Sequence, residues 1–195
     1  MAKTTLPLLL KEIRACRLCE AHLPHGARPV VQAGAGARLL IVGQAPGRRV
    51  HDTGIPWNDV SGDRLRDWLG LPREVFYDEN RVAIVPTAFC YPGKGASGDL
   101  PPRPECAPAW HGRLLRWMPD VQLTLLIGRH AQTYYLRENG NATLTETVAA
   151  YASYLPAVFP LPHPSPRNQA WWKQHPWFER EVLPALRSRV ASIFK

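Results

Sequence analysis

Four short apolar stretches alternate along the chain with segments that have a helical pattern. The stretches are ARLLIVG (37–43), RVAIVP (81–86), VQLTLLIG (121–128) and AVFPL (157–161). Each is short for a buried helix and is bounded by loop residues, which favours a buried strand. Strands that alternate with helices form a parallel sheet with both faces covered. We therefore expect an α/β fold of the three-layer α/β/α kind, with a central four-stranded, mainly parallel sheet.

Helices are expected between these strands and after the last of them. SGDRLRDWLG (61–70) has an apolar stripe with helical spacing, with Ser61 as a candidate N-cap and Gly70 as a helix stop. Loops are expected over 44–59 and 92–108, and long loops in compact domains are usually functional. The other expected helices lie within 104–118, over 129–139, and in the tail 168–194, which is interrupted near Pro176 and Pro184.

The composition, 45% hydrophobic over 195 residues, is that of a globular protein, and we expect one domain over residues 1–195. A formal net charge of +8 favours an acidic partner such as nucleic acid. No apolar run approaches the length of a membrane span, and LPLLL (6–10) is too short for the core of a signal peptide. We therefore expect a cytoplasmic monomer without membrane contact.

A proline-rich segment, LPHPSPRNQAWW (161–172), follows the last expected strand. Each proline fixes its own φ and restricts the residue before it, so His163 and Ser165 have little backbone freedom. Ligand-binding groups of α/β sheets gather where strands end, which makes His163 a candidate functional residue. A purely structural turn is the alternative.

The chain has four cysteines. Cys16 and Cys19 form a C-x2-C pair, Cys90 follows the second expected strand, and Cys106 lies at the end of the long loop. Four thiolates can hold a zinc ion or a [4Fe–4S] cluster, and the spacing does not separate the two. The other possibilities are four free thiols and a mixed zinc site that includes neighbouring histidines 22 and 25.

Several segments together resemble the uracil-DNA glycosylase superfamily. The cysteine pattern is similar to that of its iron–sulfur members, families 4 and 5, and implies a [4Fe–4S] cluster. VGQAPG (42–47) resembles the first motif of the superfamily, and HPSPRN (163–168) the second. TGIPWNDVSGDRLRDWLG (53–70) is similar to the single-strand-selective monofunctional enzymes. The resemblance implies an enzyme that binds uracil-containing DNA and hydrolyses the N-glycosidic bond of uracil, or of other deaminated bases, to leave an abasic site.

The resemblance also implies catalytic roles. Such an enzyme flips the nucleotide out of the duplex, and His163 matches the histidine that holds the uracil oxygen while negative charge develops on the base. The acid or amide of other families is missing at Ala45. Asp59 matches the aspartate of family 5 and would stabilise the cationic sugar, while Asp52 and Asp63 fit less well. An acid that only favours the start of the following helix is the alternative for Asp59.

The substrate-binding candidates come from the same motifs. Trp57 matches the aromatic side chain that stacks on the flipped base. Family 4 enzymes read the pyrimidine edge with an asparagine where Pro86 stands here, so discrimination would rest on backbone groups, Asn58 or another side chain. Arg167 and Asn168 would fill the space that the base leaves. The two motifs further contribute Gly43, Gln44, Ala45, Pro46, Gly47 and Ser165, and of these Gln44 would help to position uracil.

Two other functions stay open at this point. The first is a protein that binds or covalently traps uracil-DNA with little turnover, since some relatives form an adduct through a histidine in an arginine-rich loop. GRRVH (47–51) invites this comparison, although His51 stands at a different position from theirs. The second is a metal-stabilised nucleic-acid module without catalysis.

Overall fold

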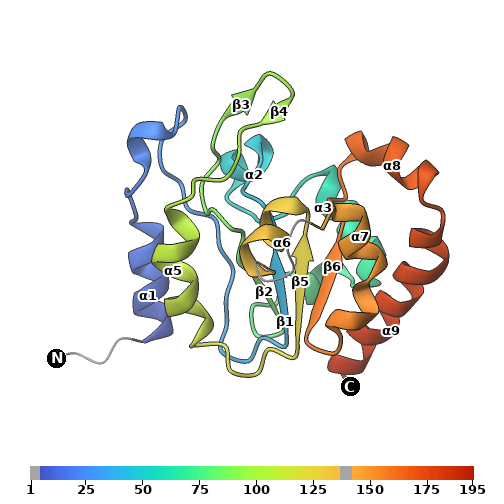
Figure 1. Cartoon of the computed structure of the whole chain (residues 1–195). Helices are drawn as coiled ribbons and strands as arrows, with labels where there is room; N and C mark the ends of the chain where they lie inside the picture. Colours follow the sequence, from blue (N-terminus) through green and yellow to red (C-terminus); the bar gives the residue numbers. More distant parts are fainter. Residues whose placement is uncertain (1–4, 137–141) are drawn as a thin grey trace.

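The computed structural model describes residues 5–136 and 142–195. Its main strands are β1 (Leu39–Val42), β2 (Val82–Ile84), β5 (Leu123–Ile127) and β6 (Val158–Leu161). They form one sheet in the order β2-β1-β5-β6, and all three neighbouring pairs are parallel (Figure 1). The predicted four-stranded parallel sheet is therefore confirmed.

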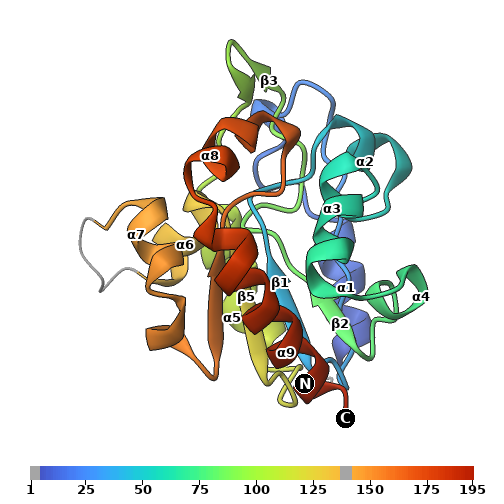
Figure 2. The same cartoon turned by 90° about the vertical axis from the view of Figure 1, so that its right-hand side faces the viewer.

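Side chains of each strand alternate between two apolar layers. The helices that form these layers are α1 (Leu6–Arg14), α3 (Val60–Leu69), α5 (Cys106–Leu115) and α9 (Leu183–Ile193). Leu39 and Ile41 belong to the apolar core with α3 and α9, whereas Leu40 and Val42 belong to the core with α1 and α5. In Figure 1, α1 and α5 lie to the left of the sheet and α9 to the right, and Figure 2 shows α9 in front of the sheet with α3 beside it. The two covered faces confirm the three-layer α/β/α class.

The remaining helical segments are shorter. They are α2 (Arg48–Thr53), α4 (Arg73–Phe76), α6 (Arg129–Tyr135), α7 (Leu144–Ala149), α8 (Gln169–Gln174), 3-10 turns at Glu20–His22, Tyr151–Tyr154 and Pro166–Asn168, and a π-helical turn at Phe178–Val182. The tail is interrupted at Pro176 as predicted. It continues through Pro184, because that proline occupies the first turn of α9, where its missing N–H costs no bond. Residues 137–139 of the helix predicted over 129–139 lie outside the described residues.

Within the described ranges, every helix is too short or too polar to cross a membrane.

The N-cap of helix α3 lies two residues earlier than the sequence predicts. Its N-cap is Asp59, whose Oδ1 accepts a hydrogen bond from the Gly62 N–H at 2.8 Å. Ser61 instead lies inside the first turn, so the N-cap prediction for Ser61 is wrong. Asp59 is the cap because its backbone is extended, with φ −148° and ψ 179°, the conformation that an N-cap requires. The predicted helix stop at Gly70 is confirmed by its left-handed φ of +63°.

Both segments predicted as loops contain short regular elements. The first includes α2, which the sequence pattern missed because six residues are too few to show an apolar period. The second includes strands β3 (Lys94–Gly95) and β4 (Gly98–Asp99), which form an antiparallel hairpin, here called the 94–99 hairpin. Gly98 has a φ of +146°, which glycine adopts readily and other residues rarely do.

The carboxyl ends of the four parallel strands meet at one edge of the sheet. The chain runs from β1 to β2 on one side and later places β5 on the other side of β1, so the strand order reverses there. Open α/β sheets bind ligands outside such a reversal. Figure 1 shows α2 and the 94–99 hairpin beyond this edge of the sheet.

Candidate active site

A cleft of about 550 Å³ opens at the carboxyl edge of the sheet. This volume is in the usual range for a small-molecule site and exceeds that of a nucleobase. The cleft brings together the loop after β1, the segment before α3, the end of β2, the 94–99 hairpin and the loop after β6. The predicted residues that line it are Gly43, Gln44, Ala45, Pro46, Gly47, Trp57, Asp59, His163, Ser165, Arg167 and Asn168. Asn58 does not line it, and its side-chain oxygen accepts a hydrogen bond from Arg73 at 3.3 Å.

His163 stands directly after β6 with its ring inside the cleft. Its centroid lies 5.4 Å from that of Trp57, and its Cβ is 3.6 Å from where a side chain on Gly128 would begin. Burial lowers the pKa of His163, and the charge of Asp59 opposes this only in part. The ring is therefore neutral at pH 7 and carries one N–H donor. Its Nδ1 is buried without a hydrogen-bond partner in the described part of the chain.

The loop that carries His163 is held by more than its prolines. The Asn168 side-chain amide donates to the His163 carbonyl at 2.7 Å, and Ser165 Oγ accepts from the Arg167 N–H at 3.3 Å. Arg64 of α3 donates to the Pro164 carbonyl at 3.1 Å, with its guanidinium 4.2 Å above the Trp172 ring. Arg64 is missing from the residues predicted from sequence, because nothing in its local pattern separates it from other helix-surface arginines.

Trp57 has an unusual backbone conformation, with a φ of +54°. Two glycines make room for it. A Cβ on Gly62 would lie 1.7 Å from the Trp57 carbonyl oxygen, and a Cβ on Gly43 would lie 3.0 Å from the indole ring. The left-handed conformation is costly for a bulky residue and is retained mainly where a function or the surroundings require it. Here it places the indole in the cleft beside His163.

Asp59 is both a helix cap and a cleft residue. One carboxylate oxygen caps α3, and the other lies 3.9 Å from where a Cβ on Gly47 would stand. The two roles therefore coexist. Asp52 and Asp63 form ion pairs with arginines at positions 48 and 66 and do not line the cleft.

The first motif is tied to its neighbours by its backbone and by one side chain. The Gln44 carbonyl accepts from the Ala88 N–H at 3.0 Å, and its side-chain amide donates to the Leu100 carbonyl at 3.3 Å. Gln44 thus connects the loop after β1 to the chain that leaves the 94–99 hairpin. Arg167 extends from the loop after β6 to this hairpin. A Cβ on Gly98 would lie only 2.5 Å from the Arg167 guanidinium.

Pro86 lines the cleft at the end of β2 and has neither an N–H nor a free carbonyl. Its carbonyl lies 3.0 Å from Nε2 of His111, whose Nδ1 lies 2.6 Å from the Tyr135 hydroxyl. A carbonyl only accepts, so Nε2 of His111 carries the proton, and Nδ1 accepts from the tyrosine. His111 is 2% exposed, and burial lowers its pKa to about 4.

We expect acid to destabilise the fold through His111. Unfolding returns its pKa from about 4 to the ordinary 6.5, so this stabilisation is complete above pH 6.5 and is lost as the pH falls toward 4. The loss amounts to about 3 kcal/mol. Chemical denaturation at pH 7 and pH 4.5 measures it. His111→Gln, which keeps a donor for Pro86 but does not titrate, should show a shallower pH dependence, and an unchanged slope would assign the acid sensitivity to other groups.

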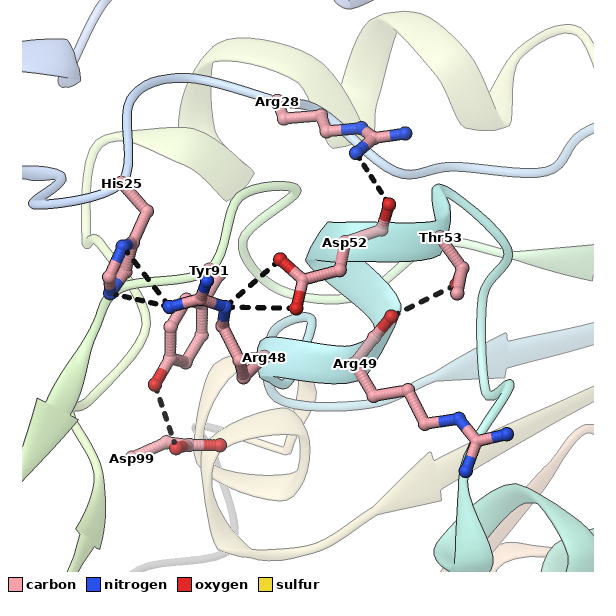
Figure 3. A network of polar contacts seen from close by, with 8 residues as sticks. All are labelled: His25, Arg28, Arg48, Arg49, Asp52, Thr53, Tyr91 and Asp99. Atoms are coloured by element: carbon pink, nitrogen blue, oxygen red, sulfur yellow. Dashed lines mark hydrogen bonds and ion pairs between the residues drawn. The ribbon is translucent and has the colours of Figure 1, made fainter.

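His51 lies away from the cleft. It is 8% exposed on α2, its ring centroid is 6.1 Å from that of His25 and 6.0 Å from that of Tyr91, and it is absent from the cleft lining. Figure 3 shows the polar network beside it, in which Arg48 pairs with Asp52 and approaches His25. A covalent adduct through His51 would therefore require this segment to open.

The four cysteines line one apolar cavity, together with Arg17 and Arg103. All four are free thiols, and burial raises the pKa of Cys90 to about 11 and of Cys106 to about 12. The histidines at positions 22 and 25 do not line this cavity, which leaves an all-sulfur set of donors. Among the described residues, no three metal-ligating side chains form a group that could hold one metal ion.

The fold and the cleft define an α/β protein with a candidate ligand site where the strand order reverses. The sequence model of the uracil DNA glycosylase superfamily matches residues 31–187, and the chain belongs to this superfamily. The matched range contains the main sheet, every cleft residue except Val30, and Cys90 and Cys106, but not the pair at positions 16 and 19. Membership makes the protein a DNA glycosylase, a hydrolase of base excision repair that acts on damaged bases in DNA.

Proposed function

We propose that the protein is a monofunctional uracil-DNA glycosylase, which hydrolyses the N-glycosidic bond of uracil in DNA and leaves an abasic site. The observation that carries this proposal is His163, a neutral histidine whose ring lies beside Trp57 in a cleft large enough for a nucleobase. A neutral donor suits the departing uracil, whose oxygen gains negative charge as the bond to the sugar breaks.

The other cleft residues supply the rest of the reaction. A flipped base would stack on Trp57, an interaction worth about 1–3 kcal/mol. The second oxygen of Asp59 would stabilise the positive charge that develops on the sugar. Among the described residues, the cleft lining includes no lysine, so no amine is placed to form a Schiff base with the sugar. These features support base release by hydrolysis without strand cleavage.

Several polar groups that could recognise a base are already hydrogen-bonded within the protein. The Pro86 carbonyl is bonded to His111, the Gln44 side-chain N–H donates to the Leu100 carbonyl, and the Asn58 side-chain oxygen accepts from Arg73. Recognition of the base edge therefore depends on backbone groups of the first motif. For this reason we include other deaminated bases in the proposed substrate range.

One assay tests the function and its main alternative. The protein is incubated with labelled single- and double-stranded oligonucleotides that contain one uracil, hypoxanthine or xanthine, then with alkali, and the products are separated on a denaturing gel. Repeated turnover to an alkali-labile site supports the glycosylase. A protein–DNA adduct that survives denaturation would instead support covalent trapping, and binding without either product would support a non-catalytic module.

We further propose that Cys16, Cys19, Cys90 and Cys106 hold a [4Fe–4S] cluster. In such a cluster each cysteine binds a different iron, so four thiols around one cavity suit it without meeting at a single point. Burial raises the pKa of Cys19 and Cys90, and the guanidinium groups of Arg103 and Arg17 oppose this only in part. The bound cluster would tie the N-terminal segment to the start of α5, a structural role, since hydrolysis requires no electron transfer.

We expect protein purified without oxygen to be brown and to contain iron and acid-labile sulfide. Cys16→Ser and Cys106→Ser should lose the iron, while Leu8→Ser, an exposed position outside this cavity, should keep it. Metal analysis together with visible absorbance provides this measurement. Zinc without iron would replace the cluster by a zinc site, and the absence of both metals from freshly isolated protein would leave four thiols.

A further inference from the structure

Hydrolysis consumes a water molecule, which must lose a proton as its oxygen bonds to the sugar. A carboxylate is the usual acceptor of that proton in the cleavage of glycosidic bonds. Among the described residues, the only carboxylates that line the cleft are Asp59 and Asp99. Asp59 already uses one oxygen as the cap of α3, and it is the carboxylate whose charge acts on His163.

Asp99 enters the cleft from the 94–99 hairpin. Its Oδ2 lies 3.6 Å from where a Cβ on Gly47 would stand, and Oδ2 of Asp59 lies 3.9 Å from the same point. The two oxygens are therefore separated by at most about 7.5 Å, the sum of these distances. Both carboxylates therefore lie beside the first motif in the same part of the cleft.

Asp99 is exposed on the hairpin, and one of its carboxylate oxygens is held by the buried Tyr91. The Tyr91 hydroxyl donates to Oδ1 of Asp99 at 3.4 Å, and the tyrosine is only 3% exposed (Figure 3). Its ring stacks on that of His25 with a centroid distance of 5.4 Å and an angle of 15°. Leu100, the residue that follows the hairpin, is bonded on both sides. Its carbonyl accepts a hydrogen bond from the Gln44 side chain, and its N–H donates to the Gly93 carbonyl at 2.9 Å. One oxygen of Asp99 is thus held, and the other is directed toward the first motif.

We infer that Asp99 is a further catalytic residue, the base that activates the attacking water; this inference rests on the proposed function. As the water oxygen bonds to C1′ of the sugar, its proton passes to Oδ2 of Asp99. The C1′–N1 bond breaks, and its electron pair leaves with the base, whose oxygen accepts a hydrogen bond from His163. Asp59 remains ionised and stabilises the sugar cation. The loop that carries Asp99 thereby supplies the acid that the first motif lacks at Ala45.

Single-turnover cleavage of a uracil-containing oligonucleotide tests this role. Asp99→Ala should lower the rate by about 10²-fold or more, the usual contribution of a positioned base. Asp52→Asn is the matched control, because this exposed carboxylate beside the same network lies outside the cleft and its amide oxygen can still accept from Arg48. Its rate should stay within about twofold of wild type, a difference below 1 kcal/mol.

Azide separates water activation from a structural effect, since it attacks carbon without having to lose a proton. Added azide should raise the rate of Asp99→Ala at least about tenfold and yield a sugar with azide at C1′, detected by mass, with little effect on wild type. A wild-type rate in Asp99→Ala, or a slow rate that azide does not raise, would overturn the inference while the activity of the wild-type protein stands. If wild type itself releases no uracil, the proposed function fails instead.

Discussion

Replacement of His163 by alanine is expected to lower the single-turnover rate of uracil release by about 10²–10³-fold, while affinity for uracil-containing DNA changes little. The ring supplies a donor at the place where the departing base becomes negative, and alanine leaves that charge without a partner. We expect other residues of the cleft, such as Arg167, to keep most of the contacts with DNA. Rapid-quench kinetics and fluorescence anisotropy measure the two quantities separately.

The pH dependence of the same reaction shows which form of His163 is used. Burial lowers its pKa below 6.5, so the neutral ring predominates above that pH. The wild-type rate should be level from neutral pH upward and should fall as acid protonates the ring. A rate that rises in acid would indicate a charged His163 acting as a proton donor. His130→Ala, which removes an exposed histidine outside the cleft, should retain the wild-type rate and profile.

Replacement of Asp59 by asparagine is expected to slow cleavage on the order of 10²-fold without loss of the fold. Asparagine caps helices as well as aspartate does, so the bond from the Gly62 N–H can persist while the negative charge disappears. Asp63→Asn is the matched control, because this carboxylate lies on the same helix, pairs with Arg66 and stays outside the cleft.

Thermal midpoints measured beside the rates separate the two roles of Asp59. Asp59→Asn should melt close to wild type, whereas Asp59→Ala should lose the cap, at a cost of about 1 kcal/mol, as well as the rate. A wild-type rate in Asp59→Asn would confine Asp59 to its cap. Leaving-group stabilisation by His163 would then carry most of the catalysis.

The parts of the site that sequence reasoning located are those encoded in contiguous segments. His163 lies in a proline-rich turn after a strand, and Trp57 and Asp59 stand just before a helix, so each is marked by its neighbours in the chain. The same local reasoning predicts Ser61 as the N-cap, whereas the structure has Asp59 there. Both residues are good caps, and only the backbone conformation at position 59 decides between them.

The alternation of the main strands and helices, the parallel sheet and the edge that carries the cleft can be predicted from sequence, because apolar period and chain connectivity are local properties. Three contacts required the folded structure: Asp99 enters the cleft, Arg64 holds the loop of His163, and the Pro86 carbonyl is bonded to His111. These residues come from a hairpin and two helices distant in sequence from the groups that they contact. Their positions depend on how the layers pack around the sheet, which no local pattern records.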